Sequence, residues 1–163
     1  MRNIIALFLF LLFLSCKSSD DNPSEVLIKD KNNEVYIAIF DSFMFMKKET
    51  FFHPTQGEIK LAEMLLVAEL NKPKSQLVAE YHFFNEKETP LPLGEYKRQY
   101  YPIINKNKEK TLYFVGVCNK LLYLYPDWTT KEIHVAGGGN CFFRGEINLS
   151  TKKITHLSVN APM

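Results

Sequence analysis

Residues 141 to 159, CFFRGEINLSTKKITHLSV, form two alternating segments around a short polar turn. In the first segment an apolar side opposes a polar side: Phe143, Ile147 and Leu149 against Arg144, Glu146 and Asn148. After the STKK turn, Leu157 and Val159 continue the pattern. Alternation with a period of two is typical of a strand that has one face in water. We therefore predict a two-stranded antiparallel hairpin in this part of the chain.

Three further strands are expected upstream of this hairpin. The segment 111–118, TLYFVGVC, is apolar on both faces, which is typical of a central strand. Residues 98 to 104 predict a neighbouring strand, and the lysine-rich segment 105–110, NKNKEK, predicts the turn between the two. Residues 76 to 84 also alternate and predict another strand.

Helices are expected before these strands. In the segment 53–74, HPTQGEIKLAEMLLVAELNKPK, we expect Leu61, Leu65 and Ala68 to share the apolar face, and Asn71 with Pro73 to end the helix. The segment 34–46, EVYIAIFDSFMFM, has apolar residues at helical spacing but a β-branched start. We favour a helix there, with a strand as the alternative.

This order of elements predicts an α+β fold. One or two N-terminal helices would pack on a curved antiparallel sheet of four to six strands, with a cystatin-like or cone-shaped sheet as one candidate. Residues 33–163 are long enough for a single domain with its own core. Without residues 1–15, Lys and Arg fall from 20 to 19 against 18 acidic residues. This balance argues against a nucleic-acid partner.

Residues 1–15 have the layout of a secretory signal peptide: Arg2, an apolar run over 4–14, and then Ser15. The run has 11 residues, and a membrane-spanning helix needs about 20, so we expect a cleaved targeting segment. Residues 13–16, FLSC, resemble the bacterial lipobox. The resemblance implies acylation of Cys16, which would hold the protein on a membrane by its acyl chains.

Residues 16–32 are expected to form the lipidated cysteine and a polar tether. Their segment 17–24, KSSDDNPS, resembles the export signals of Bacteroidota surface lipoproteins. The segments 96–115 and 137–163 resemble small uncharacterised Bacteroidota lipoproteins, with a Y-x-R-Q-Y stretch and a Gly-Gly turn before a terminal hairpin. The resemblance implies an outer-membrane location, at the cell surface rather than the periplasmic face, and brings no catalytic residues or cofactor.

Cys118 and Cys141 remain as an even pair once Cys16 is lipidated, in a compartment where disulfides persist. They are a candidate disulfide, with two buried thiols as the alternative. The sequence shows nothing that would lower a thiol pKa, so a cysteine nucleophile is not favoured.

Two local features are candidate binding elements. Six aromatic residues and one arginine fall in two short segments, and such residues are enriched in interfaces although they also cap small cores: Tyr96, Arg98, Tyr100, Tyr101, Tyr123, Tyr125 and Trp128. Three successive glycines, Gly137, Gly138 and Gly139, are either an anion-binding nest or a permissive turn. The histidines at 53, 82, 134 and 156 are isolated in sequence and predict no metal site.

The leading hypothesis is a lipid-anchored, non-enzymatic module that binds a macromolecule, such as an inhibitor, an immunity protein or an accessory subunit with a protein partner. The alternative is a small-molecule or glycan binder, or a hydrolase without a recognised motif, that uses a pocket on the sheet. Convergence of two or more of Arg98, His134, Glu146 and His156 in one cleft would favour this alternative.

Overall fold

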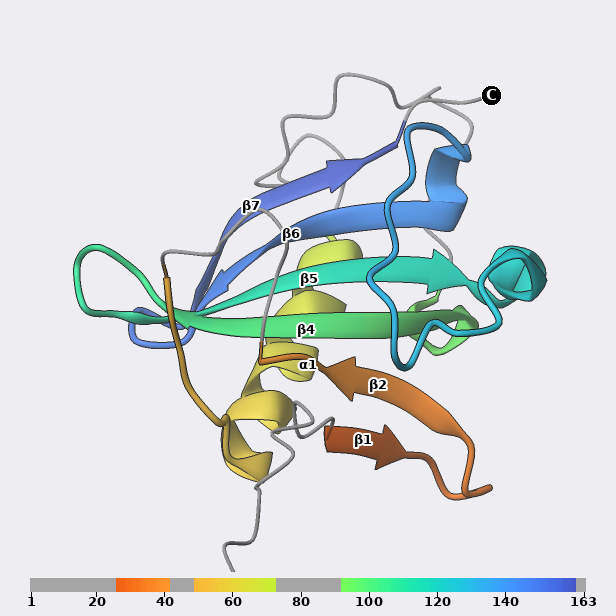
Figure 1. Cartoon of the computed structure of the whole chain (residues 1–163). Coiled ribbons are helices and arrows are strands. Elements are labelled where there is room, and N and C mark those ends of the chain that lie inside the picture. Colours follow the sequence, from red (N-terminus) through yellow and green to blue (C-terminus); the bar gives the residue numbers. More distant parts are fainter. Residues whose placement is uncertain (1–25, 42–48, 73–91, 161–163) are drawn as a thin grey trace, which may run out of the picture.

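One mixed sheet organises the molecule (Figure 1). The computed structural model describes residues 26–41, 49–72 and 92–160, and within these ranges the sheet has seven strands. The strands are β1 (Val26–Lys29), β2 (Val35–Ile39), β3 (Thr50–Phe51), β4 (Tyr96–Ile104), β5 (Lys110–Cys118), β6 (Phe142–Asn148) and β7 (Lys153–Val159). The strand order is β1-β2-β4-β5-β6-β7, with β3 paired to β4. The α+β class is confirmed, whereas four to six strands was too few.

The four strands from β4 to β7 form an antiparallel meander. Strand β4 pairs with β5 from Tyr96 opposite Cys118 to Ile104 opposite Lys110, so the predicted strands and the turn between them are confirmed. The C-terminal hairpin is confirmed as well, except that Cys141 lies in a short 3-10 helix, η4 (Gly139–Cys141), before β6 begins. As expected, β5 has a partner strand on each side.

The N-terminal part of the sheet differs from the prediction in two places. The helix predicted over 34–46 is wrong in its described part, because β2 occupies Val35–Ile39 and runs parallel to β4. Ile37, Ala38 and Ile39 are all buried, and such strands lack the alternation that distinguishes a strand from a helix. Strand β1 lies inside the predicted tether 16–32, so the sheet begins earlier than expected. The strand predicted over 76–84 lies outside the described residues.

The predicted helix is present as α1 (Gln56–Leu70) and begins with a capping box. The Glu58 backbone N–H donates to Thr55 Oγ1 at 3.2 Å, and the Thr55 N–H donates to Glu58 Oε2 at 2.8 Å. The predicted buried face is wrong: Ala68 is exposed and Leu61 and Leu65 are half-buried, while the buried residues are Ile59, Ala62, Leu66 and Glu69. Most of this helix is apolar, so spacing alone does not select the stripe that meets the sheet.

The two faces of the sheet are covered differently (Figure 1). Helix α1 lies behind the sheet, on what we call the helix face, and its Ile59, Ala62 and Leu66 belong to the larger core cluster. The chain that follows η3 (Asn119–Leu124) crosses in front of the central strands, on what we call the outer face. A smaller cluster there includes Trp128 and Ile133. No helix in the described ranges combines the length and apolar character that crossing a bilayer requires.

Candidate functional site

One buried amide holds the crossing segment on the outer face. Gln99 is fully buried on β4, and its Nε2 donates to the carbonyls of Trp128 at 2.5 Å and Lys131 at 2.6 Å. Its Oε1 accepts from the Ile133 N–H at 2.9 Å and from the Tyr101 hydroxyl at 2.7 Å. Because a buried polar group is costly unless it is hydrogen-bonded, the three bonds to Trp128, Lys131 and Ile133 fix where the segment lies.

A disulfide closes the same segment at its base. Cys118 and Cys141 are bonded, with their Cα atoms 4.7 Å apart, so the candidate disulfide is confirmed. The bond joins the end of β5 to the turn before β6 and encloses residues 119–140, which include the crossing segment. Neither sulfur is a free thiol in this state, so neither is a nucleophile.

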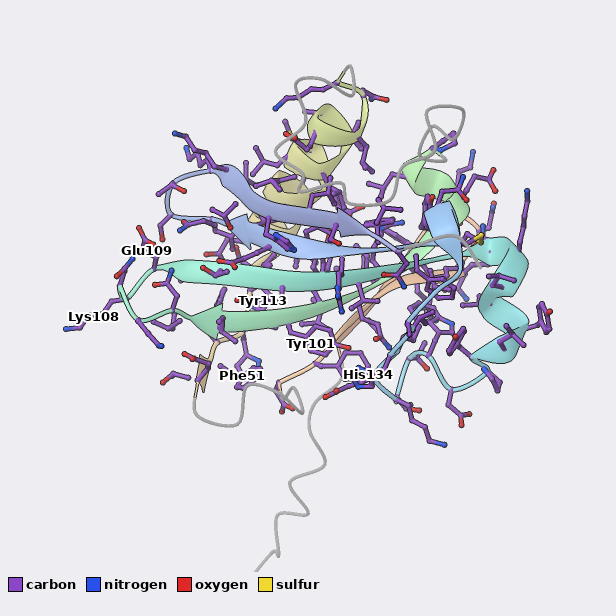
Figure 2. All side chains as sticks on the ribbon, turned by 90° about the horizontal axis from the view of Figure 1, so that it is seen from above. Phe51, Tyr101, Lys108, Glu109, Tyr113 and His134 are labelled. Atoms are coloured by element: carbon purple, nitrogen blue, oxygen red, sulfur yellow. A yellow bond between two sulfur atoms is a disulfide. The ribbon has the colours of Figure 1, made fainter. Side chains whose placement is uncertain are left out.

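Between the crossing segment and the sheet lies a cavity of about 840 Å³, which we call the outer-face pocket. Its wall is formed by residues 133–136 and Asn160. The outer face of the sheet supplies its floor: Tyr101, Tyr113, Val115, Phe142, Arg144 and His156. In Figure 2 Tyr101 and His134 lie on the side of the sheet away from α1, whereas Lys108 and Glu109 mark a distant hairpin tip. Two residues singled out from the sequence, His134 and His156, therefore meet at one cavity.

The polar groups of the pocket stand in register on neighbouring strands. Tyr113, Glu146 and His156 form one cross-strand row, and Arg144 lies in the next row, paired with neutral residues on both sides. Burial, with the Glu146 carboxylate second, raises the pKa of Tyr113 to about 12, so its hydroxyl stays protonated at neutral pH. His134 Nε2 lies 3.0 Å from Glu132 Oε2.

Asn160 joins the wall to the end of β7. Its Nδ2 donates to the carbonyls of Val135 and Gly137, both at 2.9 Å. Since Asn160 also lines the pocket, these bonds keep the wall at a defined distance from the sheet. Asn160, Tyr113 and Arg144 were not singled out from the sequence. The polar side of the C-terminal hairpin was a signal for Arg144 alone.

The aromatic segments form core rather than an exposed patch. Tyr96, Arg98, Tyr100, Tyr101 and Trp128 are buried, so the interface interpretation is wrong for them. Tyr125 is half-buried against Phe142, and only Tyr123 is open to solvent, with 74% of its surface exposed beside Leu124 at 53%. Alternation explains the result, because Tyr96, Arg98 and Tyr100 are two residues apart and face α1 together.

Arg98 links this core to the helix. Its Nε and Nη2 donate to the two carboxylate oxygens of Glu63 at 3.2 and 2.6 Å, and Nη1 donates to the Leu93 and Tyr96 carbonyls. The Tyr100 hydroxyl donates to Glu63 Oε1 at 2.5 Å, and burial together with the charge of Glu63 raises the pKa of Tyr100. Arg98 therefore stabilises the docking of α1 and does not reach the pocket.

The triple glycine is a turn in which two residues have left-handed backbone angles, Gly138 at φ 96° and Gly139 at φ 56°. A Cβ at Gly138 would lie 2.4 Å from the ring of Phe142, so close packing as well as conformation requires glycine there. The permissive turn is confirmed, and the anion nest over Gly137, Gly138 and Gly139 stays a prediction.

No group of three metal-ligating side chains occurs in the described ranges. His53 is exposed, and His82 lies outside those ranges. Comparison of the chain with protein families, with curated proteins and with solved structures finds no match. Function must therefore be argued from the geometry of the outer-face pocket.

Proposed function

We propose that the protein is a lipid-anchored envelope module that binds a small ligand, an organic molecule or a glycan unit, in the outer-face pocket. The observation that carries the proposal is the convergence of His134 and His156 in one cavity of about 840 Å³. Ligand pockets typically enclose roughly 300–1,000 Å³ and combine apolar walls with a few polar groups. The outer-face pocket has both properties.

Binding is favoured over hydrolysis by the chemistry of the pocket lining. Among the described lining residues there is no Ser, Thr or Cys that a neighbouring histidine would activate as a nucleophile. The histidines are therefore better suited to hydrogen bonding with a ligand than to activating an attacking group.

Photoreactive fragment labelling tests this function. The purified full chain would be irradiated with a set of diazirine-bearing fragments, and the adducts mapped by peptide mass spectrometry. We expect adducts on both sides of the pocket, in residues 133–136 and at Arg144 or His156. Labelling confined to other surfaces would contradict the proposal.

A macromolecular partner is the second candidate, and it is supported by the exposed pair Tyr123 and Leu124. An inhibitor, immunity or accessory role would place this pair against a protein. A photoreactive amino acid at position 123 would then crosslink a discrete partner in living cells, whereas the same substitution at the exposed Lys131 would not. Equal crosslinking patterns at the two positions would count against this candidate.

The location proposed for the module is the outer membrane, by acyl chains on Cys16, with the domain at the cell surface. The sequence of residues 13–16 supports the anchor, and the bonded Cys118 and Cys141 fit an oxidising compartment. Mass spectrometry of the natural protein would show an acylated N-terminal Cys16, and Cys16→Ala would release the protein from membranes. Protease treatment of intact cells would distinguish the surface from the periplasmic face.

A further inference from the structure

The charged or chargeable basic side chains of the outer-face pocket outnumber its acidic ones. Its lining includes three side chains that carry or can accept positive charge, Arg144, His134 and His156, and no carboxylate. The two acidic residues nearby face groups of the protein itself: Glu132 Oε2 lies 3.0 Å from His134 Nε2, and Glu146 is paired in register with Tyr113 and His156. The polar end of a ligand in this pocket therefore faces donors and cations.

Arg144 is the group best suited to bind an anion, because its guanidinium has no hydrogen-bond or ion-pair partner among the described residues. Arg98, on the opposite face, directs its donors to Glu63 and to two carbonyls. Arg144 is exposed on β6 and is paired in register with Val115 and Ser158, neither of which carries charge. A planar guanidinium in this position suits a carboxylate or a phosphate, which it can bind through two parallel hydrogen bonds.

The rest of the pocket suits an apolar ligand body. Tyr113 and Val115 are half-buried and supply part of the floor from β5, and the half-buried Val135 and the exposed Ala136 face them from the crossing segment. Aromatic and branched aliphatic side chains contribute binding through the apolar area that they remove from water. A ligand with a flat or hydrocarbon body fits between them and leaves its polar head near Arg144.

We propose that the ligand class is an organic anion, a carboxylate or a phosphate monoester on an apolar body, with the anionic head on Arg144. This inference rests on the proposed function of the pocket and specifies what the pocket accepts. His156 lies diagonally beside Arg144 across the β6–β7 pair and donates a further hydrogen bond to the head. The body lies between the sheet and residues 133–136.

Four probes that share one naphthalene body test the inference: 2-naphthoate, 2-naphthyl phosphate, 2-naphthylmethanol and 2-naphthylmethylamine. Each would be titrated into the full chain by calorimetry, with detergent blanks subtracted. We expect at least one anion to bind about tenfold or more tightly than the alcohol and the amine. Comparison of the two anions shows whether the pocket prefers a carboxylate head or a phosphate head.

The variant Arg144→Gln tests whether the guanidinium binds the anionic head. Because Arg144 is exposed, the variant should keep the unfolding midpoint of the parent. It should bind the preferred anion about tenfold to a hundredfold more weakly and bind the alcohol unchanged, as expected for loss of a charge-assisted hydrogen bond. Arg144→Lys should recover part of the loss, since it keeps the charge and loses the planar fork.

The experiment distinguishes failure of the anion inference from failure of the proposed pocket function. If the alcohol binds as tightly as the anions and Arg144→Gln changes nothing, the pocket binds ligands but the anion inference is wrong. If none of the four probes binds, both the inference and the proposed pocket function are overturned.

Discussion

The helix face and the outer face of the sheet are built from the same strands but are closed in different ways. On the helix face, a regular helix contributes Ile59, Ala62 and Leu66 to a continuous core. On the outer face, an irregular segment contributes Trp128 and Ile133 to a smaller cluster and leaves a cavity of about 840 Å³. The difference shows how one sheet can carry a continuous core on one side and a cavity on the other.

Two arginines illustrate the difference between the two faces of the sheet. Arg98 faces α1 with only 3% of its surface exposed, and its guanidinium donates to Glu63 and to the carbonyls of Leu93 and Tyr96. Arg144 faces the pocket, is exposed and has no partner among the described residues. The first arginine stabilises the fold, and we propose that the second holds a ligand.

The largest predicted effect comes from removing the buried arginine. Arg98→Ala leaves the carboxylate of Glu63 without its charged partner, so we expect the free energy of unfolding to fall by about 3–5 kcal/mol. Urea unfolding measures this change in the free energy of unfolding. The matched control, Arg144→Ala, should change stability by less than about 0.5 kcal/mol. Equal losses in the two variants would remove the distinction between the faces.

Loss of the disulfide should have the next largest effect. The double variant Cys118→Ser and Cys141→Ser opens a loop with a sequence separation of 23, and we expect a loss of about 3 kcal/mol. Hydrogen exchange should accelerate in residues 125–136 while the amides of α1 exchange at rates that only reflect the lower global stability. Uniform acceleration in both regions would show that the disulfide does not act specifically on the outer face.

Gln99→Ala tests the outer face alone, because it removes the side-chain amide that holds the crossing segment. The Ile133 N–H and two carbonyls lose their partner, and we expect a cost of about 2 kcal/mol. Trp128, the single tryptophan, should become more exposed and shift its fluorescence to longer wavelength. Gln56→Ala, at an exposed helix position, is the control and should leave both readouts unchanged. An unshifted Trp128 spectrum in Gln99→Ala would contradict this role.

The smallest effect is expected at the start of α1. The hydrogen bond from Lys110 is the main cause that lowers the pKa of Glu58, so the carboxylate contributes stability above its unfolded-state pKa and loses it as the pH falls through the folded-state value. Glu58→Gln keeps the capping geometry and removes the charge. We expect a loss of about 0.5 kcal/mol at neutral pH that disappears in acid. A loss that is independent of pH would exclude the ion pair as its source.

The sequence supports prediction of the regular elements better than of the pocket. Alternation is clear in the C-terminal hairpin, and Asn71 with Pro73 ends the predicted helix in the right place. The strand β2 was missed because its residues are buried without alternation. The predicted strand begins at Arg98, whereas β4 begins at Tyr96. With the earlier start, alternation would have placed Arg98 on the same face as Tyr96 and Tyr100.

The pocket wall could not be predicted for a physical reason. Residues 133–136 have no periodic pattern, and their position depends on hydrogen bonds to Gln99 and Asn160, which are far away in sequence. Sequence analysis therefore identified His134 and His156 individually without indicating that they share a cavity. Only the tertiary arrangement brings them together.

The most direct test of the binding account is to fill the pocket. Val115→Trp places a large ring on the pocket floor, and Val67→Trp places the same ring on the exposed side of α1. Calorimetry on the full chain, with whichever of 2-naphthoate and 2-naphthyl phosphate binds the parent more tightly, should show binding to the parent and to Val67→Trp, and no detectable binding to Val115→Trp. Undiminished binding to Val115→Trp would contradict the claim that the outer-face pocket is the ligand site.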